Sequence, residues 1–213
     1  MAAISIADLA GVVYSSGKAF DGLATGRLDT ENFLRSGSLD GITSRSDLSL
    51  LEDLRDAAQR IVDHRGPVDA DFVCEINRAI SRSGALHPGQ LRGADQQIGV
   101  STGYGRHTPA ALTEDGLQQL IDTALSGADA RENALDLFVN LAKAQPFEDG
   151  NKRTAIFAAN ALLIGAGTGQ LLTVPVDDPA LADSFNKLLA VAYVRGQHDG
   201  VKDLLRKQGL VDL

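Results

Sequence analysis

The spacing of apolar residues along the chain predicts a mainly helical protein. Between Ala134 and Ala142, apolar side chains fall at i, i+3, i+4 and i+7, the stripe of a helix with one buried face. The same period runs from Leu48 to Asp63. Capping and helix-breaking residues predict further helices over 69–80, from Thr113 to Leu125, from Asp178 and Pro179 to about Val194, and between Gly200 and Gln208.

The segment from Ile156 to Leu163 is apolar on nearly every side, so we expect it to form the helix at the centre of the core. Two glycine-rich segments interrupt the helical period. In 87–109, the alternation around Ile98 and Val100 predicts a short strand or hairpin that forms a flap. In 165–175, glycines end a helix ahead of β-prone leucine, threonine and valine residues.

The length of 213 residues suits one well-buried core with an appended element. The most linker-like stretch is 36–49, which is rich in serine, glycine and aspartate. We therefore expect residues 1–50 to form an N-terminal helical lobe or extension, and residues 51–213 to form the main domain.

Charge and cysteine content narrow the classes of protein that fit. Twenty basic side chains against twenty-eight acidic ones give a net charge of −8, so we expect no binding to nucleic acid or to an anionic membrane. No apolar run is long enough for a bilayer. Cys74 is the only cysteine, which excludes an intramolecular disulfide and a multi-cysteine zinc site. Without a basic leader before its first apolar residues, the chain is expected to be cytoplasmic.

The segment 145–155, Gln-Pro-Phe-Glu-Asp-Gly-Asn-Lys-Arg-Thr-Ala, joins the two most apolar predicted helices. Pro146 cannot continue the first helix, and Gly150 can adopt the left-handed backbone that a tight turn requires. The amides of residues 151–153 then point out of the first turn of the second helix, where free N–H groups and the helix dipole attract anions. Lys152 and Arg153 add positive charge, so the segment predicts a polyphosphate site.

Asp149 lies at the rim of the same predicted site. One carboxylate together with phosphate oxygens is a common way to hold magnesium. We expect Phe147 to anchor the loop from below. The alternative is an ordinary helix–turn–helix in which the aspartate and glycine serve as cap and turn, and Lys152 and Arg153 are solvated.

These residues resemble the signature of the Fic/Doc family, His-x-Phe-x-Asp/Glu-Gly/Ala-Asn-Gly/Lys-Arg. The matching residues are Phe147, Asp149, Gly150, Asn151, Lys152 and Arg153. Residues 88–92 and the glycine-rich run to Pro109 are similar to the family's flap, so the resemblance extends over about residues 50–205.

The resemblance implies a mainly α fold with a Fic-type helical core and a small β-hairpin flap, with residues 51–213 as the Fic-like domain. Members of the family typically transfer AMP from ATP to a hydroxyl side chain of a target protein, some transfer other phosphate-containing groups, and Doc toxins act as kinases. The implied cofactors are ATP or another nucleotide and Mg²⁺. The implied partners are a target protein bound through the flap and an antitoxin or regulator, and a homo-oligomer is compatible with the family.

Matching positions carry implied roles. The resemblance makes Asp149 the magnesium ligand, Asn151 and Arg153 phosphate ligands, and the backbone of Gly150 to Lys152 an anion nest, with Lys152 adding charge. Asp149 and Arg153 thereby become catalytic residues. The flap residues Ile98, Gly99, Val100 and Ser101 would pair with a target segment through the main chain.

The family's catalytic base is the histidine that opens the motif, and here that position is Gln145. A glutamine amide can orient a hydroxyl group but cannot take its proton, and losing a general base typically costs about 10²–10⁴-fold in rate. His87 and His107 flank the flap and are alternative bases, although a loop histidine is more often simply solvated.

Two further departures concern regulation. Many AMP-transferring members carry a second arginine where this chain has Ile156. Self-inhibited members carry a Ser/Thr-x-x-x-Glu-Gly helix, whose nearest counterpart here is the segment Ser36–Gly41, with the shorter Asp40 in place of glutamate; an ordinary loop is an equal interpretation.

Two classes of function therefore follow from the sequence. The first is a magnesium-dependent transferase in which Gln145 positions the acceptor, with a Doc-like kinase toxin as a variant. The second is a catalytically silent Fic fold that binds a nucleotide or a partner protein.

Overall fold

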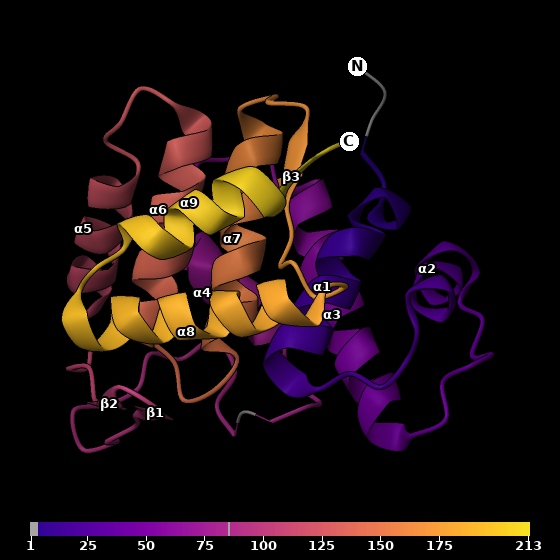
Figure 1. Ribbon diagram of the computed structural model, residues 1–213, viewed down its shortest axis with the longest axis horizontal. Helices are drawn as coiled ribbons and strands as arrows, with labels where there is room; N and C mark the ends of the chain where they lie inside the picture. Colours follow the sequence, from indigo (N-terminus) through magenta and orange to yellow (C-terminus); the bar gives the residue numbers. More distant parts are fainter. Residues whose placement is uncertain (1–3, 85) are drawn as a thin grey trace.

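The computed structural model describes residues 4–84 and 86–213, which form a mainly helical protein (Figure 1). In chain order the elements are η1 (Ile6–Leu9), α1 (Ala10–Asp21), α2 (Arg27–Ser36), α3 (Arg45–Asp63), α4 (Ala70–Ala79), β1 (Val100–Thr102), β2 (Gly105–His107), α5 (Glu114–Ala124), α6 (Ala130–Ala144), α7 (Asn151–Gly165), β3 (Gln170–Leu172), α8 (Pro179–Arg195), α9 (Asp199–Gln208) and β4 (Leu210–Asp212).

Every helix predicted from the sequence is present. Side-chain caps begin α4, α5 and α8 among them, and the caps Thr113 and Asp178 were predicted. Asp69 accepts a hydrogen bond from the Phe72 amide before α4. Thr113 and Asp178 accept bonds from the first-turn amides of α5 and α8 in the same way. Each cap satisfies an amide that has no partner within its helix.

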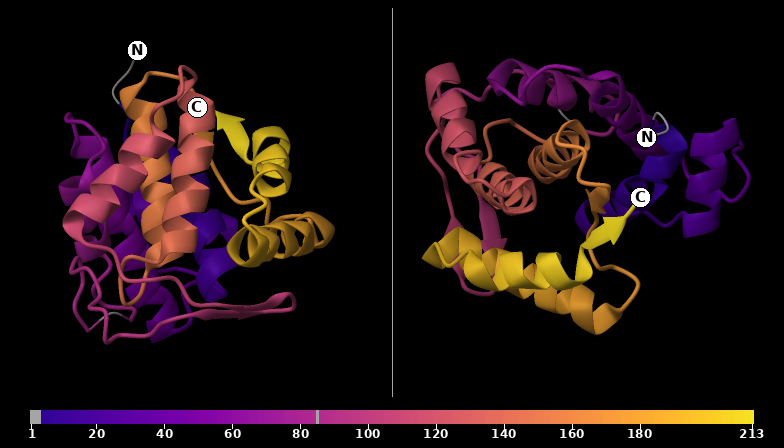
Figure 2. Two further views of the ribbon diagram at one scale, coloured as in Figure 1. Left: turned by 90° about the vertical axis from the view of Figure 1, so that its left-hand side faces the viewer. Right: turned by 90° about the horizontal axis from the view of Figure 1, so that it is seen from above.

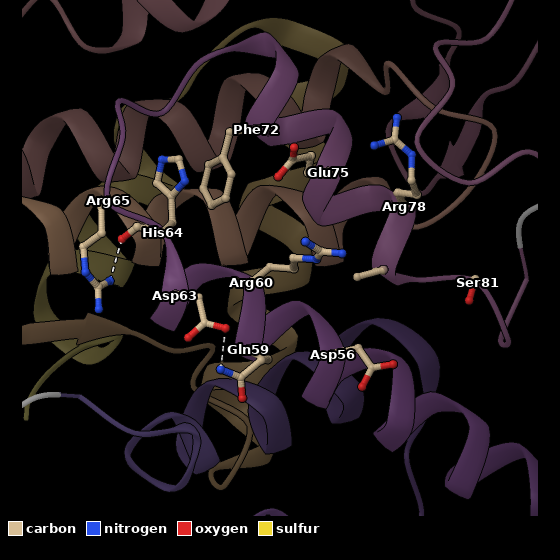
Figure 3. A pocket seen from close by; sticks show the side chains of 11 residues that line it. Asp56, Gln59, Arg60, Asp63, His64, Arg65, Phe72, Glu75, Arg78 and Ser81 are labelled. Carbon is tan, nitrogen blue, oxygen red and sulfur yellow. Dashed lines mark hydrogen bonds between the residues drawn. The ribbon is translucent and has the colours of Figure 1, made fainter.

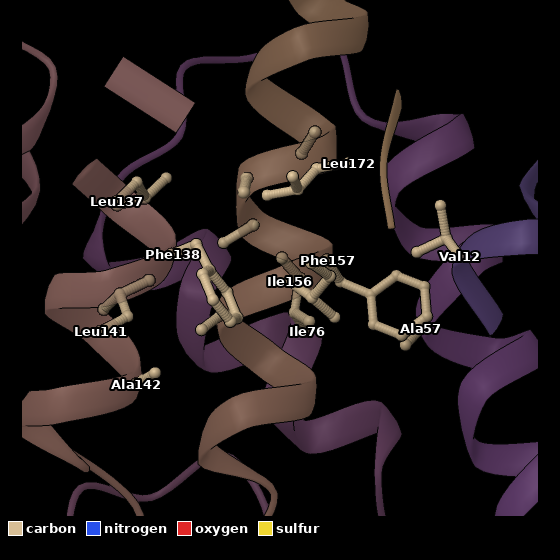
Figure 4. Close-up of a cluster of buried hydrophobic side chains, with 14 of the residues drawn as sticks. Val12, Ala57, Ile76, Leu137, Phe138, Leu141, Ala142, Ile156, Phe157 and Leu172 are labelled. Atoms are coloured by element: carbon tan, nitrogen blue, oxygen red, sulfur yellow. The ribbon is translucent and has the colours of Figure 1, made fainter. Parts of the chain in front are cut away.

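Helix α7 lies at the centre of the molecule, as its apolar sequence predicts. Ala155 through Ala159 are fully buried. Helix α6 packs along it on one side and α1, α3 and α4 contact it on others, so that the view from above shows α7 enclosed (Figure 2). The core joins residues of all these helices, including Val12, Phe138 and Ile156 (Figure 4). This packing makes the N-terminus of α7 a rigid support.

The described residues form two small antiparallel sheets. The first is the predicted flap hairpin, in which Val100 pairs with His107. Ile98 and Gly99 precede the strand, so only part of the expected strand is regular. The second sheet pairs β3 with β4 at the C-terminal end, and β4 was not predicted.

The N-terminal region is helical, as expected, but the predicted linker 36–49 is wrong in part. Ser36 is the last residue of α2, and α3 already begins at Arg45, because the Ser44 hydroxyl caps the Asp47 amide. Only residues 37–44 are loop.

Helix α1 packs on α3 and α7 and belongs to the common core. The expected boundary at residue 50 falls inside α3, and a division into lobes at 1–50 and 51–213 remains a prediction. Among residues 4–84 and 86–213, no helix has the length and apolar character to cross a membrane.

Candidate functional site

The turn between α6 and α7 has two left-handed residues. Gln145 closes α6 at φ 48° and is the one non-glycine residue with positive φ in the described chain. Gly150, the N-cap residue before α7, has φ 73°, and a Cβ there would lie 3.1 Å from the side-chain nitrogen of Asn77. The left-handed backbone therefore favours the glycine predicted to form the turn, and a side chain there would press on Asn77.

Two side chains hold the turn from within. Asn151 accepts a hydrogen bond from the Phe147 amide and donates one to the Phe147 carbonyl, both at 2.9 Å. The ring of Phe147 is buried beneath, as expected of an anchor. The Asn151 amide, which the family resemblance assigns to phosphate, is thus engaged with the loop itself in this structure.

The flap is fixed to this turn by Arg92, which is almost fully buried. Its Nε donates to the Gln145 carbonyl at 2.8 Å, and its Nη2 donates to the carbonyls of Pro109 and Ala110 at 2.8 and 2.9 Å. Burial lowers the pKa of this guanidinium. Backbone carbonyl groups therefore solvate the charge of Arg92. Their hydrogen bonds to this one side chain connect both ends of the flap to the end of α6.

Arg153 is the most constrained cation of the site, with its side chain 3% exposed. Its Nη1 donates to Ser83 Oγ at 2.6 Å and its Nη2 to Asp149 Oδ2 at 3.1 Å. Its Nε lies 3.4 Å from Oδ2 of Asp21, the last residue of α1. Burial raises the pKa of Asp21, and the charge of Arg153 offsets only part of that shift.

Lys152 extends over the ring of Phe20, with Nζ 5.1 Å from the ring centroid. Burial lowers the pKa of this ammonium group, and nearby Asp21 acts in the opposite direction. A cation held against an aromatic face in a poorly hydrated place interacts strongly with an incoming anion.

These groups surround a cavity of about 290 Å³ between the turn, the end of α1 and the flap. It is lined by Phe20, Asp21, Ile98, Gly99, Val100, Gln145, Glu148, Asp149, Gly150, Asn151, Lys152 and Arg153. All the predicted site residues except Ser101 therefore meet in one place. Ser101 lines an adjacent cavity of about 550 Å³ between the hairpin and α8, which shares Val100 and Lys152 with the first.

The Fic/DOC family model matches residues 67–163, from the segment before α4 to the last turns of α7. The chain contains a Fic/DOC family domain. The match includes the flap and the turn that line the 290 Å³ cavity.

Solved structures with Fic domains have the same fold. The Fic-1 structure (residues 134–508) from C. elegans superposes with a TM-score of 0.71 at 19% identity and covers 92% of this chain, while the chain spans only 58% of that structure. A Fic domain containing signaling protein from Bacteroides thetaiotaomicron gives a TM-score of 0.71 at 18% identity, covering 93% of this chain and 80% of its own.

The structure of BepC from Bartonella tribocorum, with bound AMPPNP, gives a TM-score of 0.50 at 17% identity and covers 93% of this chain and 98% of its own. A comparison with curated protein sequences found no match. At these identities the likeness shows the fold, which is the predicted mainly helical Fic-type core with a small hairpin.

Neither alternative histidine lines the 290 Å³ cavity. His107 Nε2 lies 2.7 Å from the Lys143 carbonyl oxygen, and its ring packs against Tyr193. His87 is exposed, with Nδ1 3.5 Å from Glu148 Oε2. The described residues that line this cavity therefore include Gln145 and the carboxylates of Asp21, Glu148 and Asp149, but no histidine.

Sequence reasoning missed Asp21, Phe20 and Ser83. The segment Ser36–Gly41, considered as an inhibitory counterpart, lines no part of this cavity, and the carboxylate that reaches Arg153 from the N-terminal region is instead Asp21. Asp21 is followed by the glycine that ends α1, but nothing in the local sequence links it to residue 153.

Another cavity, of about 570 Å³, lies between α3 and α4 (Figure 3). Its walls carry as many carboxylates as guanidinium groups, and His64 stacks on Phe72 at its edge. It contains no residue of the motif turn, and its balanced charge favours neither anions nor cations.

Proposed function

We propose that this protein binds a magnesium nucleotide at the N-terminus of α7 and transfers AMP, or another phosphate-containing group, to a hydroxyl side chain of a target protein. The observation that carries the proposal is the cavity in which Arg153, Lys152 and the first turn of α7 face the flap. The Fic/DOC domain match supports the reaction class.

The backbone amides at the start of α7 indicate where the phosphates of the nucleotide would bind. The first intrahelical bond of α7 runs from the Thr154 amide to the Gly150 carbonyl, so the amides of residues 151–153 precede it. Those amides, the helix dipole, the buried Arg153 and the half-buried Lys152 form a local anion site in a protein of net charge −8.

The adjacent 550 Å³ cavity favours a nucleotide over a bare phosphate. It continues from Val100 and Lys152 to apolar groups of α8, including Leu189 and the ring of Tyr193. A nucleoside needs such a partly apolar space next to a phosphate site. The AMPPNP bound in BepC is consistent with this assignment.

Asp149 fits the implied magnesium ion. Its side chain is 47% exposed, and Oδ2 contacts Arg153 while Oδ1 has no partner among the described residues. One carboxylate with the remaining positions filled by phosphate oxygens and water is a usual magnesium environment. When bound, the ion would neutralise phosphate charge, and Asp149 would hold it.

In the transfer, the acceptor oxygen bonds to phosphorus and the remaining phosphate group leaves with the bonding electron pair. Arg153, Lys152 and the α7 amides stabilise the negative charge that develops on the phosphoryl oxygens. Gln145 orients the acceptor hydroxyl by hydrogen bonding. Because the Gln145 amide cannot accept the proton of that hydroxyl, the proton passes to water or to phosphate. We therefore expect slow turnover relative to an enzyme with a base.

Calorimetry with ATP and magnesium tests binding. We expect Arg153→Ala to weaken affinity at least about 10-fold, as loss of a charged hydrogen-bonding partner does. Arg35→Ala, which removes an exposed arginine on α2, is the matched control and should bind like wild type. Absence of binding by wild type, or equal affinity of Arg153→Ala, contradicts the proposal.

Labelled ATP then tests chemistry. Label from the α-phosphate on protein indicates nucleotide transfer, and label from the γ-phosphate indicates kinase action. Nucleotide binding without either label favours the second function, a catalytically silent Fic fold, for which Gln145 and Ile156 are the specific observations.

A further inference from the structure

The turn that follows α4 encloses a carboxylate that the proposed reaction does not use. Asp53 of α3 is fully buried. The amides of Ser81, Arg82 and Ser83 donate to its oxygens at 3.1, 3.0 and 2.8 Å. Three consecutive amides pointing at one anion fix the backbone of this turn.

The Ser83 hydroxyl connects this carboxylate to Arg153. Its O–H donates to Asp53 Oδ2 at 2.6 Å, and its oxygen accepts from Arg153 Nη1 at 2.6 Å. A hydroxyl group has one hydrogen. Because Asp53 accepts that hydrogen, the lone pairs of Ser83 face the guanidinium, and the direction of the contact is set by the buried carboxylate.

The three contacts of Arg153 differ in how they respond to a nucleotide. Asp21 and Asp149 are carboxylates, which repel phosphate, and Asp149 is the residue that would hold magnesium. Ser83 is neutral and competes with neither phosphate nor metal. The contact between Ser83 and Arg153 is therefore the one that remains when the guanidinium binds a phosphate.

We infer that Asp53 and Ser83 are positioning residues that hold the guanidinium of Arg153 in the orientation that binds phosphate. The inference rests on the proposed function, since it assigns Arg153 a phosphate ligand. A guanidinium has five N–H groups, and with Nη1 bonded to Ser83 and Nη2 to Asp149, each terminal nitrogen keeps a second N–H. A fixed fork loses less entropy on binding than a free one.

The test measures magnesium–ATP affinity by calorimetry in Ser83→Ala and Ser83→Thr. We expect Ser83→Ala to weaken binding about 5–10-fold, the size of one typical hydrogen bond. Ser83→Thr keeps the hydroxyl and should bind within about 2-fold of wild type. Ser81→Ala is the matched control, because only the backbone of Ser81 contacts Asp53.

A double-mutant cycle separates positioning from a general effect on folding. In the Arg153→Ala background, Ser83→Ala should cause no further loss, because it acts through the guanidinium. Asp53→Asn provides a second variant, which should weaken binding at least as much, because asparagine has one acceptor oxygen where both oxygens of Asp53 accept hydrogen bonds from this turn.

Each outcome decides between the two claims. Wild-type affinity in Ser83→Ala, or an undiminished loss when Arg153 is already alanine, overturns the positioning role while the proposed function stands. A wild-type chain that does not bind magnesium–ATP overturns both. A loss in Ser83→Ala that threonine restores and Arg153→Ala abolishes supports the inference.

Discussion

At the scale of single residues, the backbone of Gln145 determines which side chains its position accepts. A left-handed conformation costs a non-glycine residue about 1 kcal/mol or more, and asparagine, aspartate and histidine tolerate it better than most. Histidine at this position therefore fits the observed turn and adds a proton acceptor at the edge of the cavity.

We predict that Gln145→His raises the rate of label transfer from ATP to protein by about 10²-fold or more, because it supplies the general base. Thermal stability should change little. Gln145→Asn is the control, since it also suits the left-handed backbone but cannot take a proton. Equal rates for the two variants would place the rate limit elsewhere.

Asp21 gives a second prediction for a single residue. Its carboxylate partly neutralises the positive charge of Arg153 and repels phosphate. Asp21→Asn should therefore raise magnesium–nucleotide affinity about 3–10-fold, with the larger effect at low salt. Asp40→Asn makes the same charge change in the exposed loop after α2 and should leave affinity unaltered. Calorimetry at two ionic strengths distinguishes the specific contact from the net charge.

At the scale of elements, the helices could be predicted from the sequence because the residues that specify each helix lie within its own segment. A cap and an apolar stripe lie within one segment, as Thr113 and the α5 face illustrate. Strand β4 was missed because its partner β3 is some forty residues away, and a three-residue strand has no period of its own. The contacts of Arg153 with Asp21 and Ser83 were missed for the same reason, since each spans the fold.

Asn160 is the contact that attaches β3 to α7. It is fully buried, donates to the Leu172 carbonyl at 2.8 Å and accepts from the Leu172 amide at 2.8 Å. Asn160→Ala leaves both backbone groups without their partner, so it should lower the free energy of unfolding by about 2–4 kcal/mol in urea titrations. Asn32→Ala on the outer helix α2 should cost less than about 1 kcal/mol.

At the scale of the whole molecule, a buried carboxylate connects the N-terminal helices to the main body. Asp47 of α3 accepts bonds from the Ala24 amide at 3.0 Å and from the Thr25 amide and hydroxyl at 2.7 Å. Burial alone would raise the pKa of Asp47, but the hydrogen bonds outweigh it and the pKa is lowered from 3.8. The folded state therefore favours the ionised form.

This direction fixes the sign of a pH effect. The stabilisation by Asp47 is complete above the unfolded pKa of 3.8 and is lost as pH falls through the lower folded value. Asp47→Asn should thus destabilise the protein by about 2 kcal/mol at pH 7, with the gap closing toward pH ~2. Urea unfolding at both pH values checks this, and Asp183→Asn, an exposed aspartate of α8, should show no such convergence.

The ion pair between Asp21 and Arg153 has a consequence for motion. A ligand that weakens the contact between Asp21 Oδ2 and Arg153 Nε removes one of the contacts that hold the end of α1. By thermodynamic linkage, a protein that binds more tightly when this contact is broken would strengthen nucleotide binding, and the nucleotide would strengthen binding of that protein by the same factor. Hydrogen exchange of the last turn of α1 should therefore speed up on saturation with nucleotide, which would make this helix a reporter of site occupancy.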